Sequence, residues 1–510
     1  MKKAKSSQFD WVAMIVPLAG VVLLGALFML IPEQSTLVLE RIRGFLGDDI
    51  GLYYILIGVL AFGASMYMAF SKFGKIKLGD IAKPAYSSFK WGAMIFTATM
   101  AADILFYSLC EWALYASEPH LAQLGAMQLW ASTFPLFHWG PIAWSFYIVL
   151  AVAFGFMLHV RLRRKQKFSE ACRPLLGSKV DGPLGKVIDL IAIFSLIAGT
   201  ATTFSLATPL LAAALAHVLG ITATAGLTIG ILLIIALVYT IAVLTGMKGI
   251  SKLASFCVYV FASLLFYFLF LGGETRYILE TGVTSIGNLA QNFIGMATWT
   301  DPLRESTGNT FAQDWTVFYW AYWMAWCVAT PFFIGMISRG RTIKNTVIGG
   351  YCWGLAGTFT SFIVLGNYGL AQQMKHGLDS AGAIAGGSDI SSAIIGIFET
   401  LPLPALALVL LCVTMVLFYS TTFDALTMVI SSYSHKELKP GAEPDKRVRT
   451  FWAILFIMFP IALIFSENSL YSLQSVSIIA AFPIGIVVTI IIISFFRDAS
   501  GYLSGSPGKK

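Results

Sequence analysis

Long apolar stretches, separated by short polar connections, recur along the whole chain. A stretch of about 20 apolar residues is long enough, as an α-helix, to cross the hydrocarbon core of a bilayer. Twelve stretches follow this pattern: 11–31, 51–70, 91–115, 140–160, 187–211, 227–245, 254–273, 315–338, 347–368, 403–432, 452–466 and 475–496. The pattern predicts an all-α integral membrane protein with 12 transmembrane helices.

The composition agrees with this interpretation. Of 510 residues, 57% are hydrophobic and only 12% are charged, whereas soluble domains carry about 25% charged residues. The first ten residues are polar and the first apolar stretch is a full span, so no cleaved signal peptide is expected. Cys172 is expected in the cytoplasm and the other five cysteines within spans, so disulfides are not expected.

The distribution of positive charge tests the number of spans. If the N-terminus is cytoplasmic, the alternating segments on that side hold 29 of the 34 Lys and Arg residues. Cytoplasmic connections of membrane proteins are enriched in Lys and Arg, so both termini are predicted to be cytoplasmic in a multi-pass protein of the plasma (cytoplasmic) membrane. The net charge of +8 then reflects topology, and no nucleic-acid partner is needed to explain it.

The eighth predicted span contains an unusual group of indoles. Trp320, Trp323 and Trp326 are three residues apart, so on a helix they fan across a roughly 120° arc of one side. Several ring faces together favour a cation that makes no hydrogen bonds, such as a trimethylammonium group.

Polar side chains within spans indicate where function lies, because they are costly in a bilayer. The third span carries Asp103 and Glu111, the fifth carries hydroxyls in 199–205, and the tenth carries them in 418–424. The fifth-span hydroxyls are expected to bond back to their own helix. The tenth-span hydroxyls fit either packing or an ion site built with carbonyls of a broken helix.

The sequence gives little support to the hypothesis that the protein is an enzyme. The six histidines are scattered without metal-ligand spacing, and no phosphate-binding loop or activated nucleophile appears. No ring-forming selectivity filter is present either. An enzyme and a channel therefore remain as remote alternatives to a transporter, and no cofactor is expected.

Two long motifs carry a family resemblance. The segments 136–147 (LFHWGPIAWSFY) and 314–323 (DWTVFYWAYW), the latter followed by Ile337-Ser-Arg-Gly-Arg341, resemble signatures of the betaine/choline/carnitine transporters. The resemblance implies two leading helices and two five-helix inverted repeats in a leucine-transporter-like fold, often assembled as a homotrimer. The implied divisions are 1–10, a cytoplasmic tail; 11–90, the leading helices; 91–273, the first repeat (spans 3–7); 274–314, an extracellular connection with an interfacial helix; 315–496, the second repeat (spans 8–12); and 497–510, a short cytoplasmic tail. Because neither tail offers a long charged helix, strong activation by osmotic stress is not expected.

Matched position by position, the resemblance implies an aromatic box for a quaternary-ammonium substrate. Its members are Trp139, Trp144, Tyr147, Trp320, Trp323 and Trp326, with Trp323 as the central ring. Tyr322 stands where relatives have a second Trp and offers a hydroxyl, and Leu114 replaces a box tyrosine of the carnitine exchangers. Tyr322, Met100 and Asp103 are the other residues expected to contact the substrate. The implied function is import of betaine, carnitine or choline by cation-coupled symport with alternating access.

The coupling ion is left open among three mechanisms. The resemblance places a sodium site between the third and tenth spans, formed by Thr97, Met100, Phe418, Thr421 and Thr422. It also places the neutral Cys257 where ion-free exchangers have an Arg, which disfavours precursor/product exchange.

Asp103 instead favours a proton as the coupling ion. The family's glycine-rich stretch reads Thr99-Met-Ala-Ala-Asp103 here, and an Asp at its last position is typical of proton-coupled choline transporters. Asp103 thus either titrates beside the substrate or caps a broken helix. Glu111 and Asp424 are expected to bond neighbouring helices. Arg341 is interpreted as a cytoplasmic anchor, and the role of Arg339 is left open.

Overall fold

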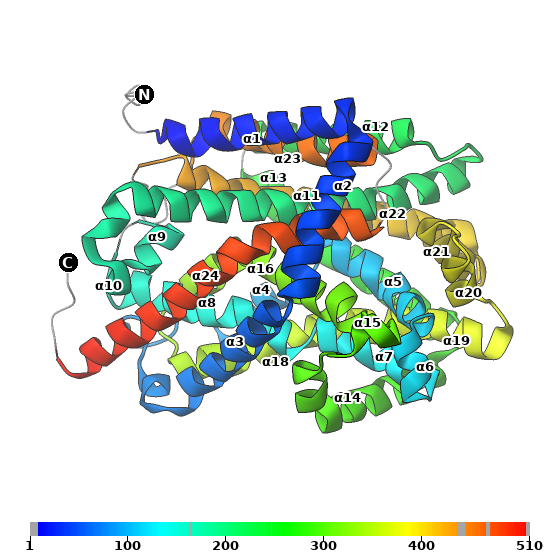
Figure 1. The fold of residues 1–510 in the computed structure, drawn as a ribbon, viewed down its shortest axis with the longest axis horizontal. Helices are drawn as coiled ribbons and strands as arrows, with labels where there is room; N and C mark the ends of the chain where they lie inside the picture. Colours follow the sequence, from blue (N-terminus) through cyan, green and yellow to red (C-terminus); the bar gives the residue numbers. More distant parts are fainter. Residues whose placement is uncertain (1–8, 164, 246, 437–443, 466–469, 506–510) are drawn as a thin grey trace.

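The computed structural model describes residues 9–163, 165–245, 247–436, 444–465 and 470–505. Within them the protein is all-helical, as predicted, and the extended contacts are two isolated bridges, Phe9 with His435 and Lys77 with Thr342. The helices form one elongated bundle with the long α11 and α24 crossing its middle (Figure 1). The α-helices are α1 (Trp11–Leu30), α2 (Pro32–Arg43), α3 (Leu52–Phe70), α4 (Ser88–Thr97), α5 (Ala102–Ala116), α6 (Pro119–Leu124), α7 (Met127–His138), α8 (Pro141–His159), α9 (Phe168–Ala171), α10 (Arg173–Leu176), α11 (Pro183–Leu219), α12 (Ala225–Thr245), α13 (Met247–Phe266), α14 (Thr275–Thr298), α15 (Arg304–Thr307), α16 (Phe318–Trp326), α17 (Thr330–Ile337), α18 (Ile343–Ser361), α19 (Asn367–His376), α20 (Ser380–Ala385), α21 (Ile390–Glu399), α22 (Pro404–Tyr433), α23 (Lys446–Phe465) and α24 (Leu470–Leu503).

Each of the predicted apolar stretches falls on one of these helices or on consecutive helices joined by a short break or a π-helical turn. Among the described residues, eight helical segments are long and apolar enough to cross a membrane, and three bent pairs raise that number to eleven. The helix α12 is the remaining predicted span, and its described apolar part is shorter. The connection 274–314 contains α14; the extracellular, interfacial helix expected in it and the two inverted repeats stay predictions.

Short turns of other helical types join or extend several of these helices. Four are π-helical, namely η2 (Gly44–Asp49), η5 (Tyr267–Leu271), η6 (Ala312–Val317) and η7 (Phe362–Gly366), and two are 3₁₀, namely η3 (Lys72–Lys75) and η4 (Gly177–Asp181). The turn η6 runs directly into α16, and η7 joins α18 to α19.

Two predicted spans are broken in their middle. The helices α4 and α5 bend by 67° around residues 98–101, and η6–α16 bends by 58° relative to α17. Pro331 stands in the first turn of α17, where its missing N–H would interrupt a continuous helix. The first break packs closely against α18, because a Cβ at Gly357 would lie 2.2 Å from the Thr99 hydroxyl oxygen.

The helices α8 and α17 approach each other through glycine. A Cβ placed on Gly335 would lie 2.7 Å from the Ala151 carbonyl oxygen and 2.8 Å from the Gly155 nitrogen. His159 on α8 also lies 3.1 Å from the Gly335 carbonyl oxygen. The second broken helix is thus packed against the segment that carries Trp144 and Tyr147.

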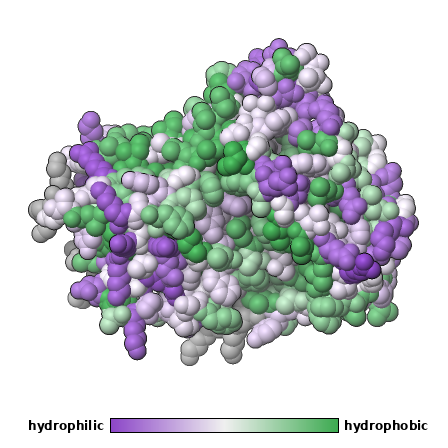
Figure 2. Space-filling model, turned by 90° about the horizontal axis from the view of Figure 1, so that it is seen from below, coloured by the Kyte–Doolittle hydropathy of each residue, from purple (hydrophilic) through white to green (hydrophobic). Residues whose placement is uncertain are grey.

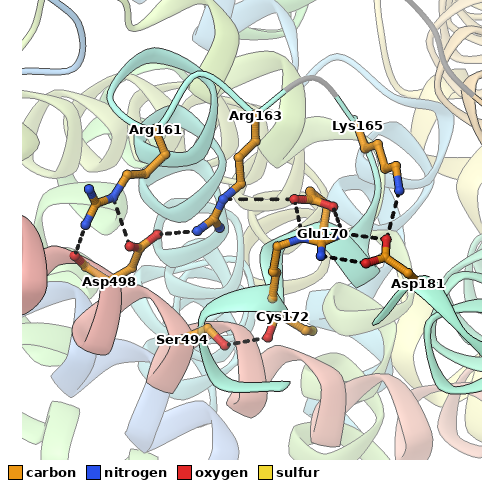
Figure 3. Close-up of polar contacts among 9 residues, drawn as sticks. Arg161, Arg163, Lys165, Glu170, Cys172, Asp181, Ser494 and Asp498 are labelled. Atoms are coloured by element: carbon orange, nitrogen blue, oxygen red, sulfur yellow. Dashed lines mark hydrogen bonds and ion pairs between the residues drawn. The ribbon is translucent and has the colours of Figure 1, made fainter. Parts of the chain in front are cut away.

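Charged side chains gather at the two ends of the bundle. At one end, Arg161 and Arg163 bind the two carboxylate oxygens of Asp498 at 2.9 and 3.0 Å (Figure 3). Elsewhere, at the C-terminal end of α2, the buried Arg43 lies 3.0 Å from Asp314. Figure 2 shows apolar surface across the middle of one face, with hydrophilic residues toward its left and right ends. This distribution suits a protein that crosses a bilayer along its long axis.

Candidate substrate site

Four of the six predicted box rings meet in the core of the bundle. The Trp323 ring centroid lies 4.8 Å from that of Tyr147, 5.5 Å from Trp144 and 5.6 Å from Trp139. All four side chains are buried, with exposed fractions of 8% or less. We call Trp139, Trp144, Tyr147 and Trp323 the ring cluster.

Local sequence explains how the ring cluster is assembled. Trp139 directly follows the last residue of α7, and Gly140-Pro141 begins α8, so Trp139 and Trp144 stand on either side of a short interruption within one continuous span. Gly354 on α18 makes room for the Trp144 indole, because a Cβ at position 354 would lie 2.7 Å from that ring. Trp323 comes from α16, immediately before the break with α17.

The other two predicted rings face different neighbours. Trp320 packs against Phe137 at 5.4 Å and His138 at 5.9 Å. Trp326 packs 6.5 Å from Tyr322, and its indole nitrogen is 3.1 Å from a Cβ placed on Gly199 of α11. The structure therefore separates Trp320 and Trp326 from the ring cluster, because each successive Trp is rotated by about 60° around the helix.

Asp103 lies beside the ring cluster in a hydrogen-bonded chain. The Tyr322 hydroxyl donates to Asp103 Oδ2 at 2.7 Å, and it also bonds the Thr203 hydroxyl on α11. The Tyr322 ring lies 6.4 Å from the Trp139 ring. Asp103 Oδ1 is buried and has no hydrogen-bond partner among the described residues.

Two indole N–H groups of the ring cluster are also free. Trp144 Nε1 and Trp323 Nε1 are buried without a hydrogen-bond partner among the described residues. Buried polar atoms are rarely left unpaired, and each requires an explanation. Together with Asp103 Oδ1, these atoms leave donors and an acceptor for a polar ligand group near the rings.

Glu111 bonds a neighbouring helix, as expected. Its Oε2 accepts a hydrogen bond from Trp139 Nε1 at 2.7 Å, and its Oε1 accepts one from the Tyr115 hydroxyl. Neither Tyr115 nor His138 was predicted from the sequence; His138 Nδ1 lies 2.7 Å from the Tyr115 hydroxyl. Spacing could have found Tyr115, because it lies one helical turn after Glu111.

The residues proposed for sodium lie on two elements. Thr97 ends α4 and Met100 lies in the break after it, whereas Phe418, Thr421 and Thr422 lie on α22. The Thr97 hydroxyl donates to the Met94 carbonyl at 3.0 Å, and the Thr421 hydroxyl to the Phe418 carbonyl at 3.0 Å. Both oxygens keep lone pairs for a cation. The described residues contain no cluster of three His, Cys, Asp or Glu side chains for a metal.

Several other predicted positions are also placed. Cys257 and Leu114 are buried on α13 and α5, and Arg339 is exposed. The side chain of Asp424 lies outside the described residues. Arg341 is buried, with its guanidinium 4.2 Å from the centre of the Trp91 ring and 3.1 Å from the Tyr86 carbonyl. It therefore joins two connections of the fold, a role that a simple surface anchor does not have.

The fold and the site define a multi-pass, all-helical membrane protein with a buried aromatic cluster. The family model of the betaine/carnitine/choline family transporters matches residues 12–502. The chain belongs to this family, and it is a transporter of the betaine, carnitine and choline type rather than an enzyme.

Relatives in the family carry different substrate names. The glycine betaine transporter of Bacillus subtilis (strain 168) is 30% identical over 98% of this chain and 95% of its own length. The carnitine transporter of Acinetobacter baumannii is 27% identical, covering 86% of this chain and 79% of its own. The high-affinity choline transport protein of Escherichia coli (strain K12) is also 27% identical, covering 94% and 71%. Identity alone therefore does not select one substrate.

Proposed function

We propose that the protein imports a quaternary-ammonium solute by cation-coupled symport, with alternating access to the ring cluster. The observation that carries this proposal is the meeting of four buried rings from α7, α8 and α16 around Trp323. A desolvated cation gains about 1–2 kcal/mol from each ring, so four rings supply about 4–8 kcal/mol before costs. Such energies correspond to roughly millimolar to micromolar affinity, which suits a carrier that must also release its load.

Sodium is the first candidate for the driving ion. Small hard cations bind oxygen ligands, and the hydroxyls of Thr97 and Thr421 retain lone pairs on two elements, one of which is broken. In this proposal Met100, Phe418 and Thr422 complete the site, with Met100 and Phe418 contributing backbone carbonyls. The neutral Cys257 argues against precursor/product exchange without an ion.

The second candidate is a proton-coupled choline transporter that uses Asp103. Its buried and unpartnered Oδ1 supports this alternative, because the carboxyl group can take up a proton or accept a hydrogen bond from a substrate hydroxyl. An ionised Asp103 would also repel the carboxylate of betaine or carnitine.

We place the protein in the cytoplasmic membrane as a homotrimer with both termini in the cytoplasm.

Uptake by reconstituted vesicles tests these proposals. Labelled betaine, carnitine and choline are supplied with sodium, with potassium in its place, and with an imposed pH gradient. Sodium symport predicts saturable accumulation that is lost in potassium. Accumulation that follows the pH gradient, and that loses this dependence in Asp103→Asn, selects the proton and choline. Equilibration without accumulation under every gradient contradicts both.

A further inference from the structure

Trp139 differs from the other indoles of the ring cluster in how its N–H group is used. Trp144 Nε1 and Trp323 Nε1 lack partners among the described residues, whereas Trp139 Nε1 donates to Glu111 Oε2 at 2.7 Å. The Trp139 carbonyl is also held, because it accepts a hydrogen bond from the Thr358 hydroxyl at 3.0 Å. Both the main chain and the ring of Trp139 are therefore fixed by neighbours.

The bond to Glu111 determines which part of the Trp139 ring can meet a ligand. An indole N–H lies in the plane of its ring, so a partner for that group fixes both the rotation and the tilt of the ring. With the N–H engaged, the ring offers the cluster its π-system. A cation interacts with the face of an aromatic ring, where the quadrupole is negative.

The second carboxylate oxygen of Glu111, Oε1, also accepts a hydrogen bond. The Tyr115 hydroxyl donates to Oε1, so it is available to accept from His138 Nδ1, which lies 2.7 Å away. His138 Nε2 then accepts from the Thr316 hydroxyl at 3.0 Å. These assignments use each proton once and require a neutral imidazole. The carboxylate is thus braced from α7 and from η6, the turn that leads into α16.

A carboxyl group with 0% exposure inside a membrane protein is costly. Packing between α5 and α7 needs only an apolar side chain, so packing does not account for an acid at this position. Its two hydrogen bonds account for it, and the one from Trp139 is the bond that reaches the ring cluster.

We propose that Glu111 is a positioning residue for substrate binding, which holds the Trp139 indole so that its face is presented to the bound ammonium group. This inference rests on the proposed function, because it requires that the ring cluster bind a quaternary ammonium ion. Glu111 itself makes no contact with the substrate in this proposal. Its effect passes through Trp139 alone.

A double-mutant cycle tests the inference. The variants are Glu111→Gln, Trp139→Phe and the pair, each purified as the full chain. Equilibrium dialysis with labelled glycine betaine and labelled choline gives the dissociation constants, and vesicle uptake gives KM and the maximal rate. Glu118→Gln is the matched control, because Glu118 Oε1 accepts from Trp315 Nε1 at 2.8 Å in the same kind of bond outside the ring cluster.

We expect Glu111→Gln to weaken binding about tenfold and to raise KM more than it lowers the maximal rate. In the Trp139→Phe background, where no indole N–H remains, the same change should alter binding less than twofold. Glu118→Gln should bind as the unaltered chain does. Equal effects of Glu111→Gln in both backgrounds, or no effect in either, overturn the inference.

Two further results remain decisive. If Glu111→Gln does not assemble, Glu111→Asp is carried through the same cycle, since it keeps the charge but loses reach toward Trp139, and the same outcomes apply. If the unaltered chain binds neither labelled ligand, and labelled carnitine does not bind in the same assay, the proposed function and this inference both fall. Binding by the unaltered chain with an additive cycle removes only the role of Glu111.

Discussion

Trp323 is the ring that contacts every other member of the ring cluster. Its replacement by Leu removes the central π-surface while filling much of the same volume, so we expect the KM for the transported solute to rise about tenfold. The measurement is uptake by vesicles that contain equal amounts of folded protein. Trp353→Leu is the control, because Trp353 packs against Phe89 at 6.1 Å and belongs to α18 outside the cluster. Equal KM values for the two variants would contradict the assignment of Trp323.

At the level of residues, the sequence identified the aromatic rings but not which neighbouring side chains each ring contacts. The spacing of Trp320, Trp323 and Trp326 places them on one side of a helix. In a packed bundle, however, an arc of about 120° on a helix surface faces several neighbouring helices. Only Trp323 meets the indoles of Trp139 and Trp144. Which neighbour faces each ring depends on helices distant in sequence, and spacing within one helix holds no such information.

The positions of the helix breaks show a similar limit at the level of elements. Pro331 marks the break before α17 in the sequence itself. The break at residues 98–101 contains neither Pro nor Gly, and the glycine that makes room for it, Gly357, lies on α18. The apolar pattern therefore predicted a single span over 91–115, and only the family resemblance indicated a broken helix there; the structure has two helices bent by 67°.

The end of α24 is joined to the connection between α8 and α11 by buried charges (Figure 3). Arg161 and Arg163 both bind Asp498, whose side chain is only 8% exposed. The change Asp498→Asn keeps the shape but leaves the partly buried Arg161 guanidinium without its counter-charge, and leaves Arg163 only Glu170, 3.9 Å away. We expect it to lower stability by about 3 kcal/mol, seen as a lower midpoint of thermal unfolding in detergent.

The same cluster provides a control for this element. Asp181 binds Lys165 and Arg173, but its side chain is 46% exposed, and solvent weakens such pairs. The change Asp181→Asn should cost about 0.5 kcal/mol or less. Matching shifts of the unfolding midpoint in the two variants would show that Asp498 does not anchor α24.

For the whole molecule, side-chain and main-chain contacts sort the connections into two groups. On one side, Asp10 N donates to the Ser434 carbonyl at 2.8 Å, and Lys167 lies 3.7 Å from Asp10. On the other side, Arg304 Nη2 donates to the Asp48 carbonyl at 2.9 Å. Segments that charge counting assigns to one side of the membrane thus contact each other in space. The alternation of twelve spans is consistent with both observations.

This sorting predicts which residues face which compartment. The side chain of Lys165 is 40% exposed in the connection expected in the cytoplasm, and that of Arg276 is 88% exposed at the start of α14, expected outside. We introduce Lys165→Cys and Arg276→Cys singly and treat vesicles of known orientation with a membrane-impermeant maleimide, using the unaltered chain to measure background labelling. The Arg276→Cys variant should react in right-side-out vesicles and the Lys165→Cys variant only in inside-out ones, because a charged reagent does not cross the bilayer. The reverse pattern would invert the topology, and labelling of both from one side would require an even number of spans between them instead of the predicted three.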